Sequence, residues 1–91
     1  MPLFALTCLD KPGHLDLRQK VRPDHLAHVA GTGVVNQGGP LLDEAGEMVG
    51  SLIVLDVPDR AAALEWSAND PYAKAGLFAQ VHLYEWKKAV V

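Results

Sequence analysis

The first part of the chain changes from a continuous apolar run to a helical repeat of apolar and polar positions. Residues 2–9 are apolar apart from Thr7, and Asp10-Lys11-Pro12-Gly13 closes the run with residues typical of a turn. An unbroken apolar run predicts a buried strand that is covered on both faces. From His14 the spacing becomes helical, and the segment between Gly31 and Gly33 is typical of a helix end.

The predicted first helix has one side that mixes apolar and reactive side chains. On a helical wheel of about 100° per residue, that side carries Arg18, Val21, Arg22, His25, Leu26 and Val29. His25 therefore points inward with apolar neighbours. Pro23 lacks a backbone N–H, so it either kinks this helix or marks the first turn of its second part.

Two strands joined by a polar turn are expected next. Residues 34–42 predict a short strand that runs into a corner at Gly38-Gly39-Pro40, where the backbone can come close to a ligand or a partner strand. Residues 43–46 are polar and predict a hairpin turn. Residues 48–57 are rich in β-branched and aliphatic residues and predict a strand, in which Ser51 points the same way as core residues.

The last third predicts one more helix and one more strand. Asp59 is a good N-terminal residue for a helix over residues 60–68. Pro71 blocks a continuous helix through residues 69–76. Residues 77–86 then predict a strand with one apolar face, made by Leu77, Ala79, Val81 and Leu83, and one mixed face, made by Phe78, Gln80, His82 and Tyr84.

The order β-α-β-β-α-β predicts an α+β, ferredoxin-like fold with an antiparallel four-stranded sheet and two helices on one face. With 91 residues, of which 49% are apolar, we expect a single domain over residues 1–91. The strands carry apolar residues on both faces, so the helix-free side is expected to pack on another copy. This predicts a homodimer or higher homo-oligomer, as a dimeric α/β barrel.

Charge and composition narrow the partners. The net charge is −3 and no basic run is longer than Lys87-Lys88, which argues against nucleic acid. No apolar stretch reaches the ~20 residues that a membrane span needs. The single cysteine, Cys8, favours a reducing compartment and is expected to be a buried apolar residue. We therefore expect a soluble, cytoplasmic protein.

His25 and Asp70 are the candidate catalytic pair. A histidine that a carboxylate orients is a general base near neutral pH, because the carboxylate fixes the tautomer and stabilises the imidazolium. His25 would transfer the proton and Asp70 would orient it. The alternative is a purely structural hydrogen bond, with Asp70 capping the turn before Pro71. A buried carboxylate needs a partner, so either interpretation predicts that the two residues pair.

Other residues are candidates for binding a small-molecule ligand. Arg22 could hold a ligand oxygen, and of Arg18 and Arg22 it is the preferred candidate. The alternative for these arginines is an ion pair with Asp70, Glu65 or Asp16. Ser51 could donate a hydrogen bond but is not expected to be a nucleophile. Three further residues are expected around the pocket: Pro40, Tyr72 and Phe78.

Neither a metal site nor a cofactor is expected. His25 and His28 lie three apart on the predicted helix but point in different directions, and no Cys/His cluster has zinc spacing. His14, His28 and His82 are interpreted as surface or dimer-contact residues.

Four motifs, in this order and at this spacing, resemble those of the YciI-like (YCII-related) family of small dimeric α+β barrel proteins. They are Arg22-Pro23-Asp24-His25-Leu26, Gly39-Pro40-Leu41-Leu42, Gly50-Ser51, and Asn69-Asp70-Pro71-Tyr72 with Ala75-Gly76-Leu77. The resemblance spans residues 3 to 86 and identifies residues 1–91 as one YCII-related domain. It implies a ferredoxin-like protomer, a dimer, and a pocket with a His/Asp pair at His25 and Asp70.

The resemblance says less about the reaction. Most members of the family have no assigned activity, and some relatives look like enzymes that remove chloride from, or isomerise, compounds derived from aromatic rings. The leading hypothesis is a dehydrochlorinase-like lyase or isomerase that uses His25 and Asp70 on a small aromatic-derived or carbonyl substrate. The alternatives are a non-catalytic dimer that binds a small molecule and an accessory partner of another enzyme.

Overall fold

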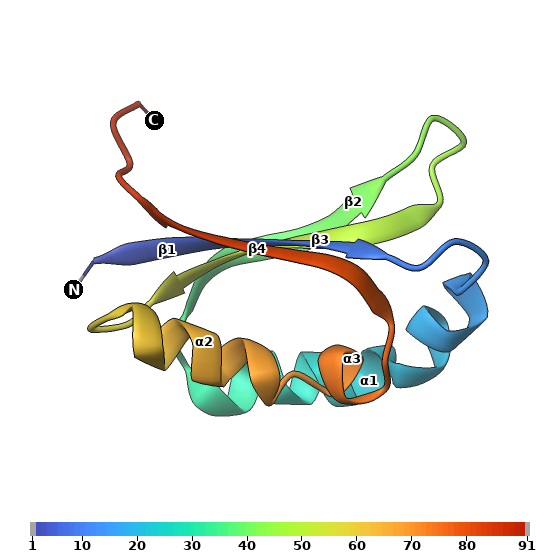
Figure 1. The fold of residues 1–91 in the computed structure, drawn as a ribbon, viewed down its shortest axis with the longest axis horizontal. Helices are drawn as coiled ribbons and strands as arrows, with labels where there is room; N and C mark the ends of the chain where they lie inside the picture. The colour runs from blue at the N-terminus through green and yellow to red at the C-terminus, as the bar shows by residue number, and fades with distance from the viewer. Residues whose placement is uncertain (1, 91) are drawn as a thin grey trace.

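The computed structural model of the chain describes residues 2–90 and has three helices on one face of a four-stranded antiparallel sheet (Figure 1). The elements are β1 (Leu3–Asp10), α1 (Leu15–Thr32), β2 (Val35–Leu42), β3 (Met48–Asp56), α2 (Arg60–Ala68), α3 (Pro71–Lys74) and β4 (Phe78–Trp86). The strand order is β2-β3-β1-β4. The predicted α+β, ferredoxin-like fold is confirmed. The two end residues of the predicted domain lie outside the described range.

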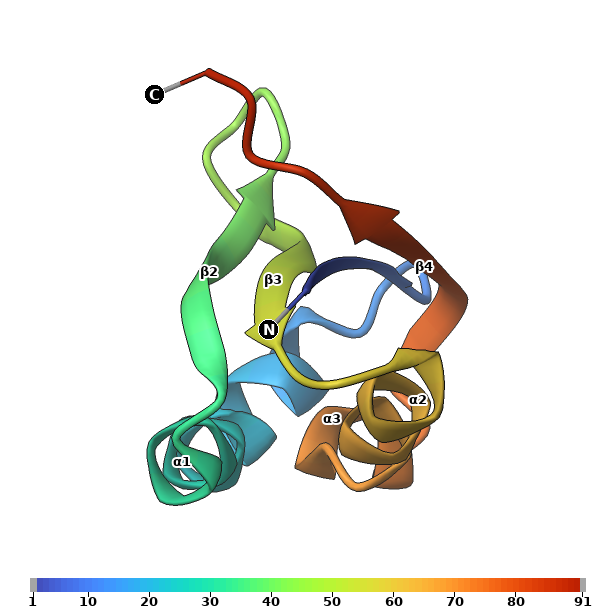
Figure 2. The same cartoon turned by 90° about the vertical axis from the view of Figure 1, so that its left-hand side faces the viewer.

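The core lies between the sheet and the helices (Figure 2). It is built from alternate residues of β1 and β3, the inner side of α2, one residue of β4 and the residue after β3, namely Phe4, Leu6, Cys8, Ile53, Leu55, Val57, Ala63, Trp66 and Leu83. Cys8 is a buried member of this core, as expected, and burial raises the pKa of its thiol to about 12. The prediction that both faces of β1 are covered is wrong for the single chain, because the helices leave the other face open.

Helix α1 runs without a break through Pro23 to a left-handed Gly33. Pro23 therefore does not begin a separate helix. Arg18 and His25, two turns apart, are the residues of α1 that are buried. The inward position of His25 is confirmed.

Two details of the strands differ from the prediction. Strand β2 continues through Gly38-Gly39-Pro40 without a corner, since it is an edge strand and can accommodate a proline that has no N–H to donate. In β4, the pairing shifts so that Asp10 faces Phe78 while Leu9 faces Gln80. This irregularity turns Phe78 toward the core, on the same side as Leu83. The prediction that Phe78 and Leu83 lie on opposite faces of the strand is therefore wrong.

The segment after α2 forms a short helix that the sequence did not predict. Pro71 takes the first position of α3, where its missing N–H costs nothing. Asp70 is the N-cap, and its Oδ1 accepts a hydrogen bond of 2.9 Å from the backbone N of Tyr72. The cap fixes Asp70 at the inner end of α3, beside α1.

Candidate active site

A cavity of about 200 Å³ lies between α1, the edge of the sheet and α3. Its lining comprises Arg18, Arg22, His25, Leu26, Val29, Val35, Gly38, Gly39, Pro40, Ser51, Ile53 and Tyr72. The helical side expected from the sequence thus forms one wall, and the Gly38-Gly39-Pro40 segment of β2 faces it. The small residues of β2 leave room for the cavity.

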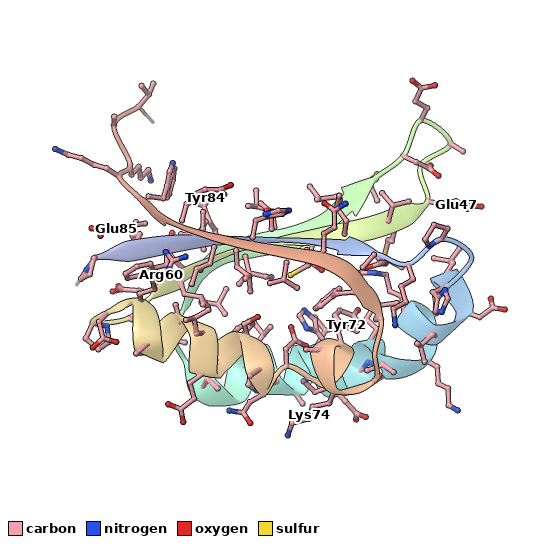
Figure 3. The ribbon with its side chains drawn as sticks, viewed as in Figure 1. Glu47, Arg60, Tyr72, Lys74, Tyr84 and Glu85 are labelled. Carbon is pink, nitrogen blue, oxygen red and sulfur yellow. The ribbon has the colours of Figure 1, made fainter. Side chains whose placement is uncertain are left out.

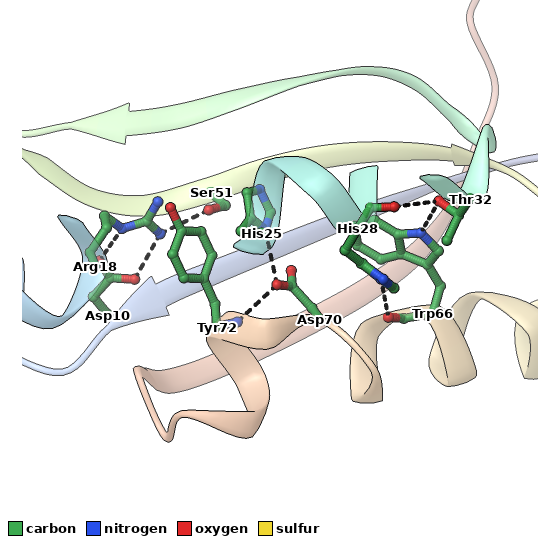
Figure 4. Close-up of polar contacts among 9 residues, drawn as sticks. All are labelled: Asp10, Arg18, His25, His28, Thr32, Ser51, Trp66, Asp70 and Tyr72. Atoms are coloured by element: carbon green, nitrogen blue, oxygen red, sulfur yellow. Dashed lines mark hydrogen bonds and ion pairs between the residues drawn. The ribbon is translucent and has the colours of Figure 1, made fainter. Parts of the chain in front are cut away.

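His25 and Asp70 meet at the base of this site (Figure 4). Nδ1 of His25 lies 2.9 Å from Oδ1 of Asp70, and the two residues are only 6% and 2% exposed. A carboxylate only accepts hydrogen bonds, so Nδ1 carries the proton and donates it. In the neutral ring, Nε2 is then the basic nitrogen, and it makes no hydrogen bond to any of residues 2–90.

Tyr72 fixes the plane of the imidazole. Its ring stacks on His25 at a centroid distance of 4.2 Å and an interplanar angle of 18°. Phe78 packs edge-on against the same tyrosine, with centroids 6.0 Å apart. Stacking on one side and the Asp70 hydrogen bond at Nδ1 together leave Nε2 as the free polar atom of a positioned ring.

Arg18 is held by an ion pair that the sequence analysis did not find. Its Nε and Nη2 donate to the two oxygens of Asp10 at 2.6 and 2.9 Å, and Nη2 also donates to Ser51 Oγ at 2.8 Å. The guanidinium carbon lies 4.4 Å from the centre of the Tyr72 ring. Burial alone would lower the pKa of Arg18, but the hydrogen bonds and the charge of Asp10 outweigh it and raise that pKa.

The phenol of Tyr72 lies under opposing influences. Burial raises its pKa, while the positive charges of Arg18 and Arg22 act to lower it, and the net direction is upward. Tyr72 therefore stays a neutral phenol near neutral pH. The positive charge of Arg22 thus reaches the phenol of Tyr72.

The structure brings together most of the residues that the sequence proposed. Arg22, His25, Pro40, Ser51 and Tyr72 line the cavity, and Asp70 lies behind His25. Phe78 is not a lining residue; it supports Tyr72 from behind.

Arg22 was preferred over Arg18 as a ligand-binding residue, but the sequence did not reveal the role of Arg18. Arg18 is the buried one, and its partner is Asp10 in place of Asp70, Glu65 or Asp16. The burial of Arg18 could have been predicted, because Arg18 shares one side of the helix with His25. Its ion pair with Asp10 could not, because the sequence pattern assigns Asp10 to a turn, whereas it is the last residue of β1.

His28 is not a plain surface residue, because it contacts Trp66 of α2. Its ring lies 4.5 Å from that of Trp66, and its Nε2 lies 3.2 Å from the Trp66 carbonyl oxygen. The indole N–H of Trp66 donates to Thr32 Oγ at 2.9 Å. His28 thus joins α1 to α2. Within residues 2–90, no three His, Cys, Asp or Glu side chains are grouped so as to hold a metal ion.

Comparison with known proteins identifies the family. The model of the YCII-related domain matches residues 2–87. The chain belongs to the YCII-related family. An uncharacterized protein of Haemophilus influenzae is 32% identical over 95 residues, covering 93% of this chain and 96% of its own. The YciI protein of Escherichia coli is 30% identical, covering 94% of this chain and 97% of its own.

Solved structures agree with this membership. The 5-chloro-2-hydroxyhydroquinone dehydrochlorinase of Burkholderia phenoliruptrix, in complex with 2,5-dihydroxybenzoquinone, has a TM-score of 0.85 and 31% identity over 93% of each chain. SnoaB, a cofactor-independent oxygenase of Streptomyces nogalater, has a TM-score of 0.65 at 15% identity and covers 97% of this chain and 95% of its own. The latter likeness shows only the shared α+β barrel fold.

Among residues 2–90, no helix is both long enough and apolar enough to cross a bilayer.

Proposed function

We propose that this protein is a small lyase or isomerase that uses His25 as a general base on a small aromatic-derived or carbonyl substrate. The observation that carries the proposal is the state of the imidazole. Its Nδ1 donates to a buried carboxylate, His25 lines a cavity of about 200 Å³, and Nε2 makes no hydrogen bond to any of residues 2–90. A base needs this combination of a fixed tautomer and an accessible basic nitrogen.

The proposed reaction begins with the transfer of one proton from the substrate to His25. Nε2 of His25 takes a proton from the substrate, and the carboxylate of Asp70 stabilises the imidazolium that forms. In an elimination, the electrons of the broken bond to hydrogen form a new double bond and a chloride leaves with its own electron pair. In an isomerisation, His25 returns the proton to another substrate atom.

The likeness to the dehydrochlorinase of Burkholderia phenoliruptrix supports this reaction class. At 31% identity over 93% of both chains, the two proteins share one fold. Removal of hydrogen chloride from a chlorinated hydroxyhydroquinone, the reaction named for that relative, is an elimination of the kind that a histidine base would promote.

Binding without turnover is the second candidate function. Oδ1 of Asp70 also accepts the N–H of Tyr72 and caps α3, so the carboxylate has a structural task beside the one proposed in catalysis. A protein that used the pair for architecture alone would retain the cavity and bind ligands there without reaction.

Turnover measurements distinguish the two candidates. Chlorinated hydroxybenzenes, catechols and muconolactone-type lactones are incubated with the protein, and chloride release and ultraviolet spectra are followed. We expect turnover of at least one compound, and a loss of about 10²–10⁴-fold in kcat when His25→Ala removes the base. His14→Ala, a histidine outside the cavity, should retain full activity.

Two results would reject the enzymatic proposal. One is saturable binding of these compounds without any turnover, which would support the binding module. The other is turnover that His25→Ala leaves unchanged, which would place the chemistry on another group.

We further propose that the protein works as a homodimer or higher homo-oligomer. The proteins it resembles in fold are dimeric α+β barrels, and here the sheet face opposite the helices is open. Figure 3 shows Tyr84 on this open side and Tyr72 between the sheet and the helices. The His25 cavity lies between α1 and the sheet, so a second copy placed on the open face would not occupy it.

A further inference from the structure

The charges that line the cavity are all of one kind. Among residues 2–90, four ionisable side chains line it, namely Arg18, Arg22, His25 and Tyr72, and no carboxylate does. The two acids of the site, Asp10 and Asp70, lie behind the wall, where each holds a lining residue in place. The whole chain has a net charge of −3, so a cavity lined by two arginines and by no carboxylate differs from the average of the chain.

Only one of the two arginines is free to bind a ligand. Arg18 is 2% exposed, and its charge is balanced by a bidentate ion pair with Asp10. Arg22 is exposed, lines the cavity, and makes no hydrogen bond or ion pair with any of residues 2–90. Its charge nevertheless reaches inward, because together with Arg18 it opposes the burial that raises the pKa of Tyr72. Arg22 is therefore an unpaired cation directed at the cavity.

The rest of the wall suits an apolar body of limited size. Five of the lining residues are aliphatic or proline: Leu26, Val29, Val35, Pro40 and Ile53. The cavity measures about 200 Å³. An apolar cavity of roughly 150 Å³ holds a benzene molecule, so this one has room for a single ring with one or two substituents.

We propose that the site selects small organic anions the size of one ring, with the charged oxygen on the Arg22 guanidinium and the apolar body against the aliphatic wall. A planar guanidinium can bind a carboxylate or a phenolate through paired N–H donors. The ring then lies beside Nε2 of His25, the atom proposed to take the proton. This inference rests on the proposed function and names its substrate class.

Three probes of known charge and size test the selection. They are benzoate, its neutral isostere benzamide, and acetate, which has the charge without the ring. Each is titrated into the protein at pH 8, and binding is followed by calorimetry and by the amide shifts of residues that line the cavity. The same titrations are made with Arg22→Gln and with Lys20→Gln, which removes an equal charge from α1 away from the cavity.

We expect benzoate to bind at least about tenfold more tightly than benzamide, the size of a charge-assisted hydrogen bond, and more tightly than acetate. Arg22→Gln should abolish the preference for benzoate over benzamide, and Lys20→Gln should leave it intact. The inference is wrong if benzamide binds within twofold of benzoate, or if Arg22→Gln preserves the preference. Acetate binding as tightly as benzoate would refute the role of the apolar wall.

A fourth variant separates this inference from the proposed reaction. His25→Gln should eliminate turnover and keep the preference for benzoate over benzamide. If benzoate is selected by the wild-type protein but no compound turns over, the anion site stands and the enzymatic proposal fails. If compounds turn over with no dependence on charge or on Arg22, the enzymatic proposal stands and the anion site fails.

Discussion

One oxygen of Asp70 serves two donors that come from different parts of the chain. Oδ1 accepts from the Tyr72 backbone at 2.9 Å and from the His25 ring at 2.9 Å. The first bond fixes the start of α3 and so fixes Tyr72, whose ring then stacks on His25. The orientation of the imidazole and the position of its neighbour Tyr72 are thus coupled through a single carboxylate.

At the residue scale, Arg18 should carry much of the stability of the site. Arg18→Gln would leave Asp10, whose side chain is 6% exposed, as a buried carboxylate without its partner. Loss of one member of a buried ion pair typically costs about 3–5 kcal/mol. Urea denaturation followed by circular dichroism should show a drop of this order in the free energy of unfolding. Arg22→Gln, a matched change on the same helix, should stay within about 0.5 kcal/mol of the wild type.

A double variant checks that the loss comes from the pair. Arg18→Gln with Asp10→Asn removes both charges together, and we expect it to be destabilised less than the sum of the two single variants. Additive losses, or an Arg18→Gln protein as stable as the wild type, would contradict this account of Arg18.

At the element scale, the sequence predicted every strand and both long helices, along with the side of α1 that faces the cavity. The periodicity was enough for this, because an apolar face has to be buried. The pair Arg18 and Asp10 was missed because it joins two elements through polar atoms, which follow no period. The turn of Phe78 toward the core was missed because it depends on a shifted register between β1 and β4, and α3 because Pro71 was interpreted as a helix breaker.

Close contact between β1 and β3 gives a test at the same scale. A Cβ on Gly50 would clash with the carbonyl oxygen of Cys8, so the two strands would have to separate. Gly50→Ala should therefore lower the free energy of unfolding by about 1–3 kcal/mol. Gly39→Ala, on β2, meets nothing within 4 Å and should change stability little. Thermal and urea melts of both variants measure the difference, and equal stability of the two would contradict the packing described.

At the scale of the whole molecule, the open sheet face has the composition of a surface that another protein chain covers. We define it by Leu9 of β1, Leu52 of β3 and Tyr84 of β4, which are 41%, 40% and 62% exposed. A shallow hollow on this face is lined by further apolar residues, including Ala5, Leu41, Val54 and Trp86. Apolar surface of this kind on a thin, one-sided protomer favours association with a second copy through the same face.

The proposed dimer can be tested with two leucines of similar exposure on opposite sides of the molecule. Leu52→Lys places a charge in the middle of the open sheet face, while Leu64→Lys places one on α2, which covers the other side of the sheet and where Leu64 is 50% exposed. Burying an unpaired charge between two sheets is costly. Light scattering at micromolar concentration should therefore give twice the 9.8 kDa monomer mass for the wild type and for Leu64→Lys, and the monomer mass for Leu52→Lys.

A wild-type monomer would refute the proposed dimer. A dimer that only Leu64→Lys disrupts would show that the two copies associate through another surface. Because Leu52 does not line the His25 cavity, which lies between α1 and the sheet, a folded Leu52→Lys monomer should still bind benzoate in preference to benzamide.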